Sequence, residues 1–202
     1  MEISLEDFPD DIYVLLRDDF RKKFFKEAYG INGGSRRLCV LLGVSRTSLE
    51  SWRRSYQKKR FGMLGEQFFS LGKIRKICCL CNGSKIVNMS SVEKNIISYR
   101  AISGNLSILN PIFPIKNNLF LGEIIGHLLG DGTAQDIEKR TSRYSNNSKE
   151  MVIAFARKLS CFGELNKVYI YPYEYNAQHN INYSFSFSKA ITKILLNKLK
   201  IN

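Results

Sequence analysis

The stretch 121–133 (LGEIIGHLLGDGT) carries the residue pattern of this chain that points most directly to chemistry. Gly122, Gly126 and Gly130 recur every four residues, so they share one face of a helix. Each glycine inside a helix costs about 0.8–1 kcal/mol relative to alanine, and a second backbone packed closely against the glycines would offset that cost. The expected helix ends in Gly-Asp-Gly. Asp131 therefore sits at a helix C-terminus, which is unfavourable for a carboxylate unless a cation binds there.

The elements that must position this helix follow it in a regular order. We expect a helix at 119–130, strands near 133–138 and 141–146, a helix at 148–162, strands at 167–173 and 181–188, and a last helix at 189–199. The helix at 148–162 has an expected apolar face of Met151, Ile153, Ala154, Phe155 and Leu159. In the last strand, apolar residues from Ile181 to Phe187 alternate with Asn182, Ser184, Ser186 and Ser188, so one face should be buried and the other wet.

This α-β-β-α-β-β-α order, opened by a glycine-striped helix, resembles the LAGLIDADG homing endonuclease family. The nine residues 124–132 (IIGHLLGDG) fall on the nine-letter family motif, with Gly126, Asp131 and Gly132 at its most characteristic positions. The segment RYSNNSKEMVIAFARKLSCFG is similar to the one that follows the motif in this family. The resemblance covers residues 118–202. Departures are Leu129, where the motif has an acid, and His127, which we expect to be partly buried rather than catalytic.

The resemblance implies a site-specific endonuclease that hydrolyses phosphodiester bonds of double-stranded DNA. Two motif helices pack along their glycines, and metal ions bound at their ends stabilise the attacking and leaving oxygens. Asp131 would be the catalytic ligand of Mg²⁺ (or Mn²⁺), with the carbonyl of Gly130 as a helper. Lys189, with Lys139 behind it, is the candidate basic residue. One motif copy implies a homodimer through the glycine-striped helix, unless a second motif-bearing half is missing.

The resemblance also implies that the sheet forms a saddle in the major groove of DNA. The side chains expected to contact DNA from this domain are Lys139, Arg143, Lys167, Tyr169, Tyr171, Asn182, Ser184 and Ser186.

A second DNA-binding pattern lies nearer the N-terminus. Residues 35–42 predict a short helix, 43–45 a tight turn, and 46–56 a second helix capped by Ser45. The sequence SRRLCVLLGVSRTSLESWRRSYQKKR resembles a helix-turn-helix, whose second helix enters the major groove. Its expected core is Leu38, Leu41, Leu42, Val44, Leu49 and Trp52. Its expected DNA contacts are Arg36, Arg37, Arg46, Thr47, Ser48, Arg53, Arg54, Lys58, Lys59 and Arg60. A plain helical hairpin with a solvated basic face is the alternative.

The charge of the chain is strongly and unevenly positive. Its 202 residues carry 31 basic and 18 acidic side chains, a net charge of +13. Residues 35–100 alone hold 14 basic and 3 acidic side chains. A segment this basic that keeps apolar periodicity favours a polyanionic partner, although a lysine-rich genome would give a similar bias.

Other features limit the location and the class of protein. No apolar stretch is long enough to span a bilayer, and the acid-rich opening is unlike a signal or transit peptide, so we expect an intracellular, cytoplasmic, nucleoid-associated protein without membrane contact. Cys78 and Cys81 form a lone CxxC, whereas a structural zinc needs four ligands. We therefore interpret them as buried or half-buried helix residues.

The predicted fold class is α+β, in three segments. Residues 1–60 are predicted to form a helical region that includes one long helix at 9–29 and the helix-turn-helix. Residues 61–116 are predicted to form a mixed connector, with a helix at 68–80 and a strand near 95–99. Residues 117–202 are predicted to form the endonuclease domain. The alternative function is a non-catalytic DNA-binding regulator or intron-splicing cofactor that uses the same fold. An intein is disfavoured because the chain starts Met-Glu and ends Ile-Asn.

Overall fold

The computed structural model describes residues 2–54, 56–58, 64–102, 106–116, 119–130, 142–165, 170–175 and 180–199. The protein is a mixed α+β protein with antiparallel sheets. It divides into two compact units, which we call unit 1 (Met1–Phe8 with Ser103–Asn202) and unit 2 (Pro9–Ile102). None of the helices in the described part of the chain is both long and apolar enough to cross a membrane.

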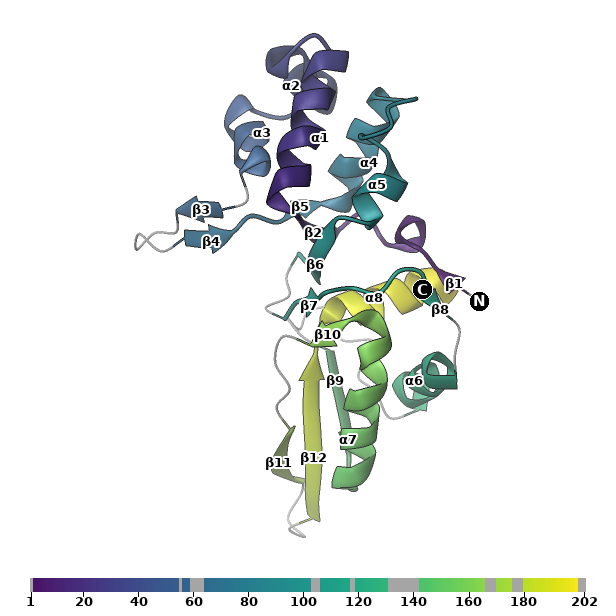
Figure 1. Ribbon diagram of the computed structural model, residues 1–202. Helices are drawn as coiled ribbons and strands as arrows, with labels where there is room; N and C mark the ends of the chain where they lie inside the picture. Colours follow the sequence, from purple (N-terminus) through teal and green to yellow (C-terminus); the bar gives the residue numbers. More distant parts are fainter. Residues whose placement is uncertain are drawn as a thin grey trace. The chain divides into compact units, whose positions relative to one another are not determined.

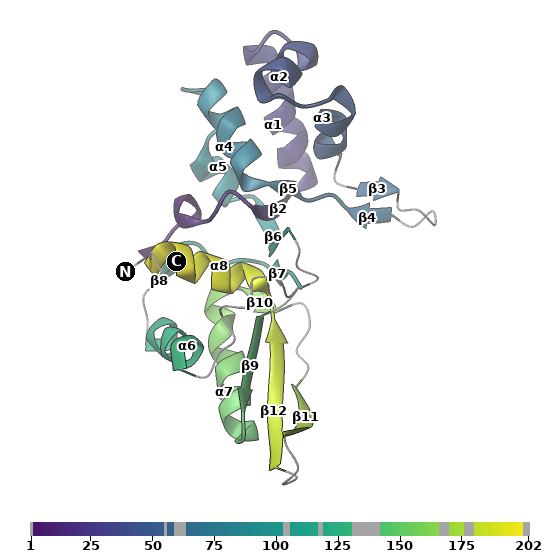
Figure 2. The same cartoon turned by 180° about the vertical axis from the view of Figure 1, so that it is seen from behind.

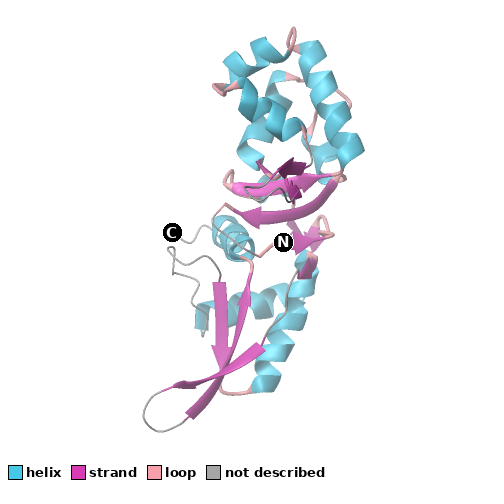
Figure 3. Ribbon diagram, turned by 90° about the vertical axis from the view of Figure 1, so that its left-hand side faces the viewer, coloured by secondary structure: helices cyan, strands magenta, loops and turns pink. Residues whose placement is uncertain are grey.

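Unit 2 contains the helix-turn-helix and a small sheet, and Figure 3 distinguishes its grouped helices from its strands. Its elements in chain order are β2 (Ile12–Leu16), α1 (Asp18–Ile31), α2 (Ser35–Leu42), α3 (Arg46–Arg53), β3 (Tyr56–Lys58), β4 (Leu64–Glu66), β5 (Phe69–Ser70), α4 (Leu71–Leu80), α5 (Met89–Glu93) and β6 (Ile96–Ala101). Strand β2 pairs antiparallel with both β5 and β6, so that Val14 lies opposite Phe69 on one side and Tyr99 on the other. Residues 61–102 thus share a unit with the helix-turn-helix instead of forming a separate connector.

The long helix predicted at 9–29 is wrong over its first part. Residues Ile12–Leu16 form the central strand β2, and the helix α1 begins only at Asp18. Ile12, Val14, Leu15 and Leu16 are all buried. An apolar run of this length fits a fully covered strand as well as a helix, and the pairing with two neighbouring strands decides between them.

The two short helices and the turn between them that were predicted from residue 35 onward are present as α2 and α3. Gly43 has a φ of +63° in the turn, a left-handed conformation that glycine adopts without strain. The hydroxyl of Ser45 accepts a hydrogen bond of 3.1 Å from the amide of Ser48, which caps α3 as predicted. Helix α3 ends at Arg53, three residues earlier than expected.

The expected core of the helix-turn-helix is partly confirmed. Leu38, Leu42 and Leu49 are buried, and Val44 and Trp52 are half-buried. Leu41 is 48% exposed, so its assignment to the core was wrong. It is the next-to-last residue of α2, beside the buried Leu42.

Unit 1 surrounds a three-stranded sheet. Its elements in chain order are β1 (Glu2–Ile3), the 3₁₀ helix η1 (Leu5–Asp7), β7 (Ile108–Leu109), β8 (Ile115–Lys116), α6 (Leu119–Gly130), β9 (Ser142–Asn146), α7 (Lys149–Lys158), the 3₁₀ helix η2 (Leu159–Phe162), β10 (Glu164–Leu165), β11 (Ile170–Tyr175), β12 (Asn180–Phe187) and α8 (Lys189–Leu199). The sheet has the antiparallel order β11-β12-β9, and α7 runs along it (Figures 1 and 2). The strand predicted at 133–138 lies outside the described residues.

Aromatic side chains form the core between α7 and the sheet. Phe185 lies opposite Tyr144 on one neighbouring strand and opposite Ile170 on the other. Tyr144 stacks on Phe155 of α7 with ring centroids 4.3 Å apart, and Phe155 also contacts Phe187. These four aromatic residues are completely or almost completely buried, which is the main source of hydrophobic stabilisation in this unit.

Two details of the predicted burial pattern were wrong. The buried face of α7 contains Val152 and Ala156 beside Phe155 and Leu159, whereas Met151 is 41% exposed. Residues 152, 155, 156 and 159 follow the 3.6-residue period of a helix, and the interpretation that included Met151 was rotated by one residue. In β12, Ile181 is 53% exposed because it lies near the end of the strand, away from α8.

Backbone and side-chain contacts bring the first eight residues into unit 1. Ile3 in β1 lies opposite Ile115 in β8. Lys198 of α8 forms an ion pair of 2.7 Å with Asp7. Burial alone would raise the pKa of Asp7, but hydrogen bonds from Lys198 and Ser4 outweigh it and lower the pKa.

Candidate nucleic-acid interface

Helix α6 has the predicted bounds and two unlike faces. Leu121, Ile124 and Leu128 are buried against unit 1. Gly122 and Gly126 are exposed, and a Cβ atom built on either one meets nothing within 4 Å. We call the surface around Gly122 and Gly126 the glycine face; Leu119, 76% exposed, and Phe120, 46% exposed, lie at the start of the same helix. Within the described part of unit 1, no backbone packs against the glycines.

Several predicted site residues fall outside the described residues. Helix α6 is described up to Gly130, which directly precedes Asp131 in the sequence. The undescribed residues on which predictions were made are Lys59, Arg60, Asp131, Gly132, Lys139, Lys167 and Tyr169, together with the side chain of Lys58.

His127 packs inside unit 1, as expected for a partly buried residue. Its Nδ1 lies 3.1 Å from the hydroxyl of Tyr144 on β9. Its ring meets Tyr144 and Phe155 edge-on, with centroid distances of 5.2 and 5.7 Å. The imidazole therefore links α6 to the sheet and to α7, and fixes the orientation of the helix that carries the motif.

Three of the predicted DNA-contacting residues lie together on the sheet. Arg143 lies opposite Ser186 on the neighbouring strand, and its guanidinium carbon is 6.0 Å from the centre of the Tyr171 ring. The hydroxyls of Tyr171 and Ser186 are 3.0 Å apart. Burial would raise the pKa of Tyr171, but hydrogen bonds from Ser186 and Ser184 and the charge of Arg143 lower it. Asn182 is half-buried on the same strand as Ser186.

Ser184 does not belong to that exposed surface. It is completely buried, its hydroxyl lies 3.2 Å from that of Ser145, and its cross-strand neighbour is the large Tyr171. Period-2 alternation placed Ser184 on the same face as Ser186, but the expectation that it is exposed was wrong, because alternation cannot show that Tyr171 on the next strand lies opposite it.

Lys189 is buried as well. It is the first residue of α8 and is 8% exposed, directly after Ser188, whose hydroxyl donates a 2.9 Å hydrogen bond to the carbonyl of Leu106. Most of this side chain is therefore covered by the protein. The assignment of Lys189 as the basic catalytic residue stays a prediction.

The basic residues of the helix-turn-helix lie on the surface of unit 2. Those predicted to contact DNA that are exposed are Arg36, Arg37, Arg46, Thr47, Arg53 and Arg54. Ser48 is half-buried, and its hydroxyl lies 2.9 Å from that of Ser45 in the helix cap, so its first role is to cap α3. Arg53 forms an ion pair of 3.1 Å with Glu50 on its own helix.

The sequence analysis missed a basic cavity in unit 2. It has a volume of about 520 Å³, and its lining residues are Lys22, Lys26, Tyr29, Arg53 and Arg54. The spacing of Lys22, Lys26 and Tyr29 (i, i+4, i+7) places them on one face of α1. That spacing is visible in the sequence, but residues 1–34 hold 8 acidic and 5 basic side chains, and this net negative charge does not suggest a basic site there.

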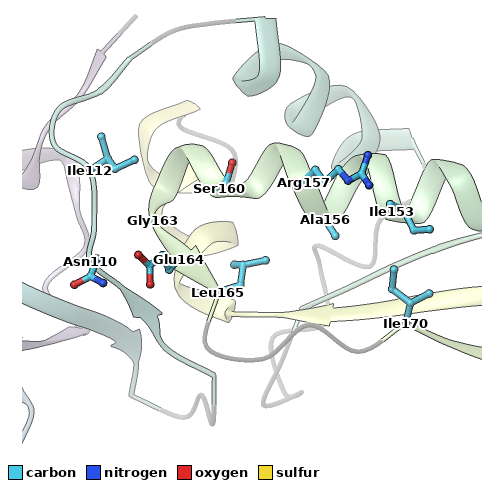
Figure 4. Close-up of a pocket in the computed structure, with 10 residues that line it drawn as sticks. All are labelled: Asn110, Ile112, Ile153, Ala156, Arg157, Ser160, Gly163, Glu164, Leu165 and Ile170. Atoms are coloured by element: carbon cyan, nitrogen blue, oxygen red, sulfur yellow. The ribbon is translucent and has the colours of Figure 1, made fainter.

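A second cavity, of about 630 Å³, lies in unit 1 (Figure 4). Ile153, Ala156 and Arg157 project into it from α7, facing Leu165 and Ile170. Among the described residues of its lining, Arg157 and Glu164 are the charged side chains and most of the others are apolar.

The predicted burial of Cys78 and Cys81 is confirmed, although Cys81 lies one residue after the end of α4. Cys78 is half-buried and Cys81 is buried, and the Cys81 sulfur accepts a hydrogen bond from Nδ2 of Asn32 at 3.2 Å. Burial raises the pKa of Cys78 to about 12, so its thiol stays protonated at neutral pH. Cys79 is exposed. Across the described residues, no group of three or more His, Cys, Asp or Glu side chains could hold a metal ion.

Comparison with known protein families, with curated proteins and with solved structures gives no match to this chain.

Proposed function

We propose that the protein is a site-specific DNA endonuclease of the LAGLIDADG type that acts as a homodimer. The observation that carries this proposal is the glycine face of α6. Gly122 and Gly126 lie on an exposed helix surface with free space around them, and the helix reaches Gly130 one residue before Asp131. Glycines that weaken a helix and meet nothing among the described residues fit a close contact with a second helix.

A second copy of the same helix is the partner that symmetry favours. In a twofold contact the same surface is used by both subunits, so the glycines of one copy meet the glycines of the other. The exposed Leu119 and Phe120 would add apolar area to this contact. Such a pairing would bring two Asp131 side chains close to the twofold axis, one for each DNA strand.

The donor set at the end of α6 suits Mg²⁺ or Mn²⁺. Asp131 and the carbonyl of Gly130 offer oxygen ligands, which these hard cations prefer. When bound, such an ion supplies charge stabilisation to the attacking and leaving oxygens of phosphodiester hydrolysis. The task of the chain is to hold the carboxylates and the scissile phosphate in register, and the contact of His127 with Tyr144 supports the orientation of α6.

Two surfaces support DNA as the substrate. On the sheet, Arg143, Tyr171 and Ser186 combine a cation, an aromatic ring and hydroxyls on one exposed patch. On unit 2, the exposed arginines of the helix-turn-helix add positive charge that attracts the phosphate backbone. The second surface would add affinity to whatever sequence the first one recognises.

The test is cleavage of a plasmid library of random inserts, with sequencing of the ends produced in Mg²⁺. We expect recurrent, nearly palindromic double-strand breaks that need the metal ion. Asp131→Asn should lower cutting by about 10³-fold or more. Asp136→Asn makes the same charge change outside the motif and serves as the control.

Mixing the wild-type chain with the Asp131→Asn chain sharpens this test. Mixed dimers carry one intact carboxylate and should nick one strand instead of linearising the plasmid. Salt-sensitive DNA binding without any cutting would contradict the endonuclease. That result would favour a non-catalytic regulator or splicing cofactor, an alternative that the burial of Lys189 supports.

A further inference from the structure

The basic cavity of unit 2 is formed by two helices that lie side by side, α1 and α3 (Figures 1 and 2). Lys22, Lys26 and Tyr29 come from one face of α1, and Arg53 and Arg54 come from the end of α3. Its volume of about 520 Å³ is in the range of cavities that bind small ligands. The cavity can therefore enclose one anionic group and part of what that group is attached to.

The charges around the cavity leave an excess of positive charge. Two carboxylates lie at its edges: Asp18 pairs with Lys22 at 2.6 Å, and Glu50 pairs with Arg53 at 3.1 Å. Lys26 and Arg54 form no ion pair with any described carboxylate. These two side chains are the cations available to an incoming anion.

Unsatisfied donors lie next to this excess charge. Arg21 is completely buried, and its Nη1 donates a 2.8 Å hydrogen bond to the carbonyl of Arg54. Its Nε and Nη2 atoms, and the buried hydroxyl of Tyr29, have no acceptor within the described structure. A buried donor without an acceptor is costly. Among the described residues, the part of unit 2 around Arg21 and Tyr29 therefore lacks acceptor atoms for these donors.

Both groups keep their protons at neutral pH. Burial lowers the pKa of Arg21 to about 10, which still leaves its guanidinium charged. Burial, together with the charge of Glu50, raises the pKa of Tyr29 to about 12, so its hydroxyl remains a donor. Among the described residues, the cavity thus combines the Tyr29 hydroxyl with the cations Lys26 and Arg54 and offers them no acceptor. The ligand that complements this set is a compact oxyanion with several oxygens.

We propose that the basic cavity is a phosphate-binding site and that it holds one backbone phosphate of DNA beside α3. This rests on the proposed function only for the source of the phosphate, since the cavity itself is defined by unit 2. Phosphate oxygens would accept hydrogen bonds from Lys26, Arg54 and Tyr29. A phosphate contact at the C-terminal end of α3 would fix the register of the exposed residues at its N-terminal end.

The first arm of the test measures DNA binding by fluorescence anisotropy, without metal ion, over a range of salt concentrations. The cavity variant is Lys26→Gln with Arg54→Gln, and the control is Lys23→Gln with Lys94→Gln, two exposed lysines of unit 2 that do not line the cavity. We expect the cavity variant to bind about tenfold more weakly and its log–log salt slope to shrink by about one, as for one lost phosphate contact. The control should change the slope by less than half of this.

The second arm identifies a free phosphate as the ligand. The intact chain is unfolded by heat in inorganic phosphate and in chloride at equal ionic strength. If the ligand is free phosphate, the midpoint rises with phosphate for the wild type and the control but not for the cavity variant, while the DNA salt slope stays unchanged. A change in either arm identifies the source of the phosphate, and no change in both arms overturns the site.

Neither arm measures cleavage. A chain that never cuts DNA would therefore contradict the endonuclease and leave this site intact. A chain that cuts normally while both arms show no change would contradict this site and leave the endonuclease intact.

Discussion

In unit 2, the surface between α1 and α3 presents lysines and arginines around a cavity, whereas in unit 1 the outer face of α6 presents glycine, leucine and phenylalanine. Each surface includes a feature that destabilises its own unit. Unit 2 buries Arg21 with two donor nitrogens unsatisfied, and unit 1 keeps two glycines inside a helix where nothing fills the space beside them. Such local costs concentrate at functional sites.

The chemistry of the two costs differs, and so do the partners that would relieve them. In unit 2, a ligand with acceptor oxygens and negative charge would stabilise the unsatisfied donors and the excess positive charge. In unit 1, another backbone packed closely against α6 would fill the open space beside its glycines. We therefore expect phosphate at the first surface and protein at the second.

The largest expected effect tests whether a substitution in one unit destabilises only that unit. Gly163, in unit 1, has a φ of +126°, and a Cβ there would lie 2.6 Å from the carbonyl oxygen of Leu109. Gly163→Ala should lower the free energy of unfolding by about 3 kcal/mol. Hydrogen exchange should place the loss in unit 1. Gly83→Ala, in unit 2, has a φ of +86° but open space, and should cost only about 1 kcal/mol. Equal losses in both units would contradict the separation.

The next prediction concerns the unsatisfied donor atoms of the buried Arg21 in unit 2. Arg21→Met keeps an apolar stem of similar length and removes the two unsatisfied nitrogens of the buried guanidinium. We expect urea unfolding to show a gain of about 1–2 kcal/mol, because the cost of desolvating the buried guanidinium outweighs its attraction to Asp18 and lowers its pKa. Destabilisation by more than about 1 kcal/mol would mean that the bond to the carbonyl of Arg54 matters more than the orphaned donors.

The corresponding substitution in unit 1 should have effects of opposite sign on folding and on association. Gly126→Ala should stabilise the separated chain by about 1 kcal/mol, since a Cβ meets nothing there. It should also weaken self-association by about tenfold or more, measured by sedimentation, because the methyl group separates the two backbones. Gly30→Ala in α1 of unit 2 also has open space and should stabilise without changing association. Unchanged association in both variants would exclude the glycine face as the dimer contact.

The smallest expected effect concerns the ion pair between Asp7 and Lys198 of α8. Because the pKa of Asp7 is lowered, its ion pair with Lys198 stabilises unit 1 above the unfolded pKa and is lost as the pH falls through the folded pKa. Asp7→Asn should cost about 0.5 kcal/mol at pH 7, as is usual for a partly exposed pair. The difference from the wild type should vanish well below the ordinary pKa of 3.8. A difference that persists there would point to the lost hydrogen bonds instead of the charge.

The sequence predicted the elements that carry their own start and stop signals. Helices α2, α6 and α8 match their expected bounds, and Ser45 caps α3 as expected, because caps, glycines and helical periodicity are local properties. Strand β2 was predicted as a helix because an apolar run fits both structures. Only its pairing with β5 and β6, which lie far away in the sequence, decides between them.

For the candidate sites as well, properties set by a residue's own segment could be predicted and properties set by distant segments could not. The exposure of Arg53 and Arg54 was predictable from local charge, but the burial of Ser184 and Lys189 depends on side chains brought by other elements. The basic cavity needs α1 to lie against α3, so no single segment of the sequence contains it. Single-sequence patterns thus predicted the charge of the site and missed its shape.

The pairing of β1 with β8 has a consequence for how this protein is made. Ile3 is synthesised before unit 2, yet its partner Ile115 is synthesised only after the whole of unit 2. The strand β1 therefore has no partner strand while unit 2 is being made. Because domains generally fold as units during synthesis, we expect unit 2 to fold before β1 pairs with β8.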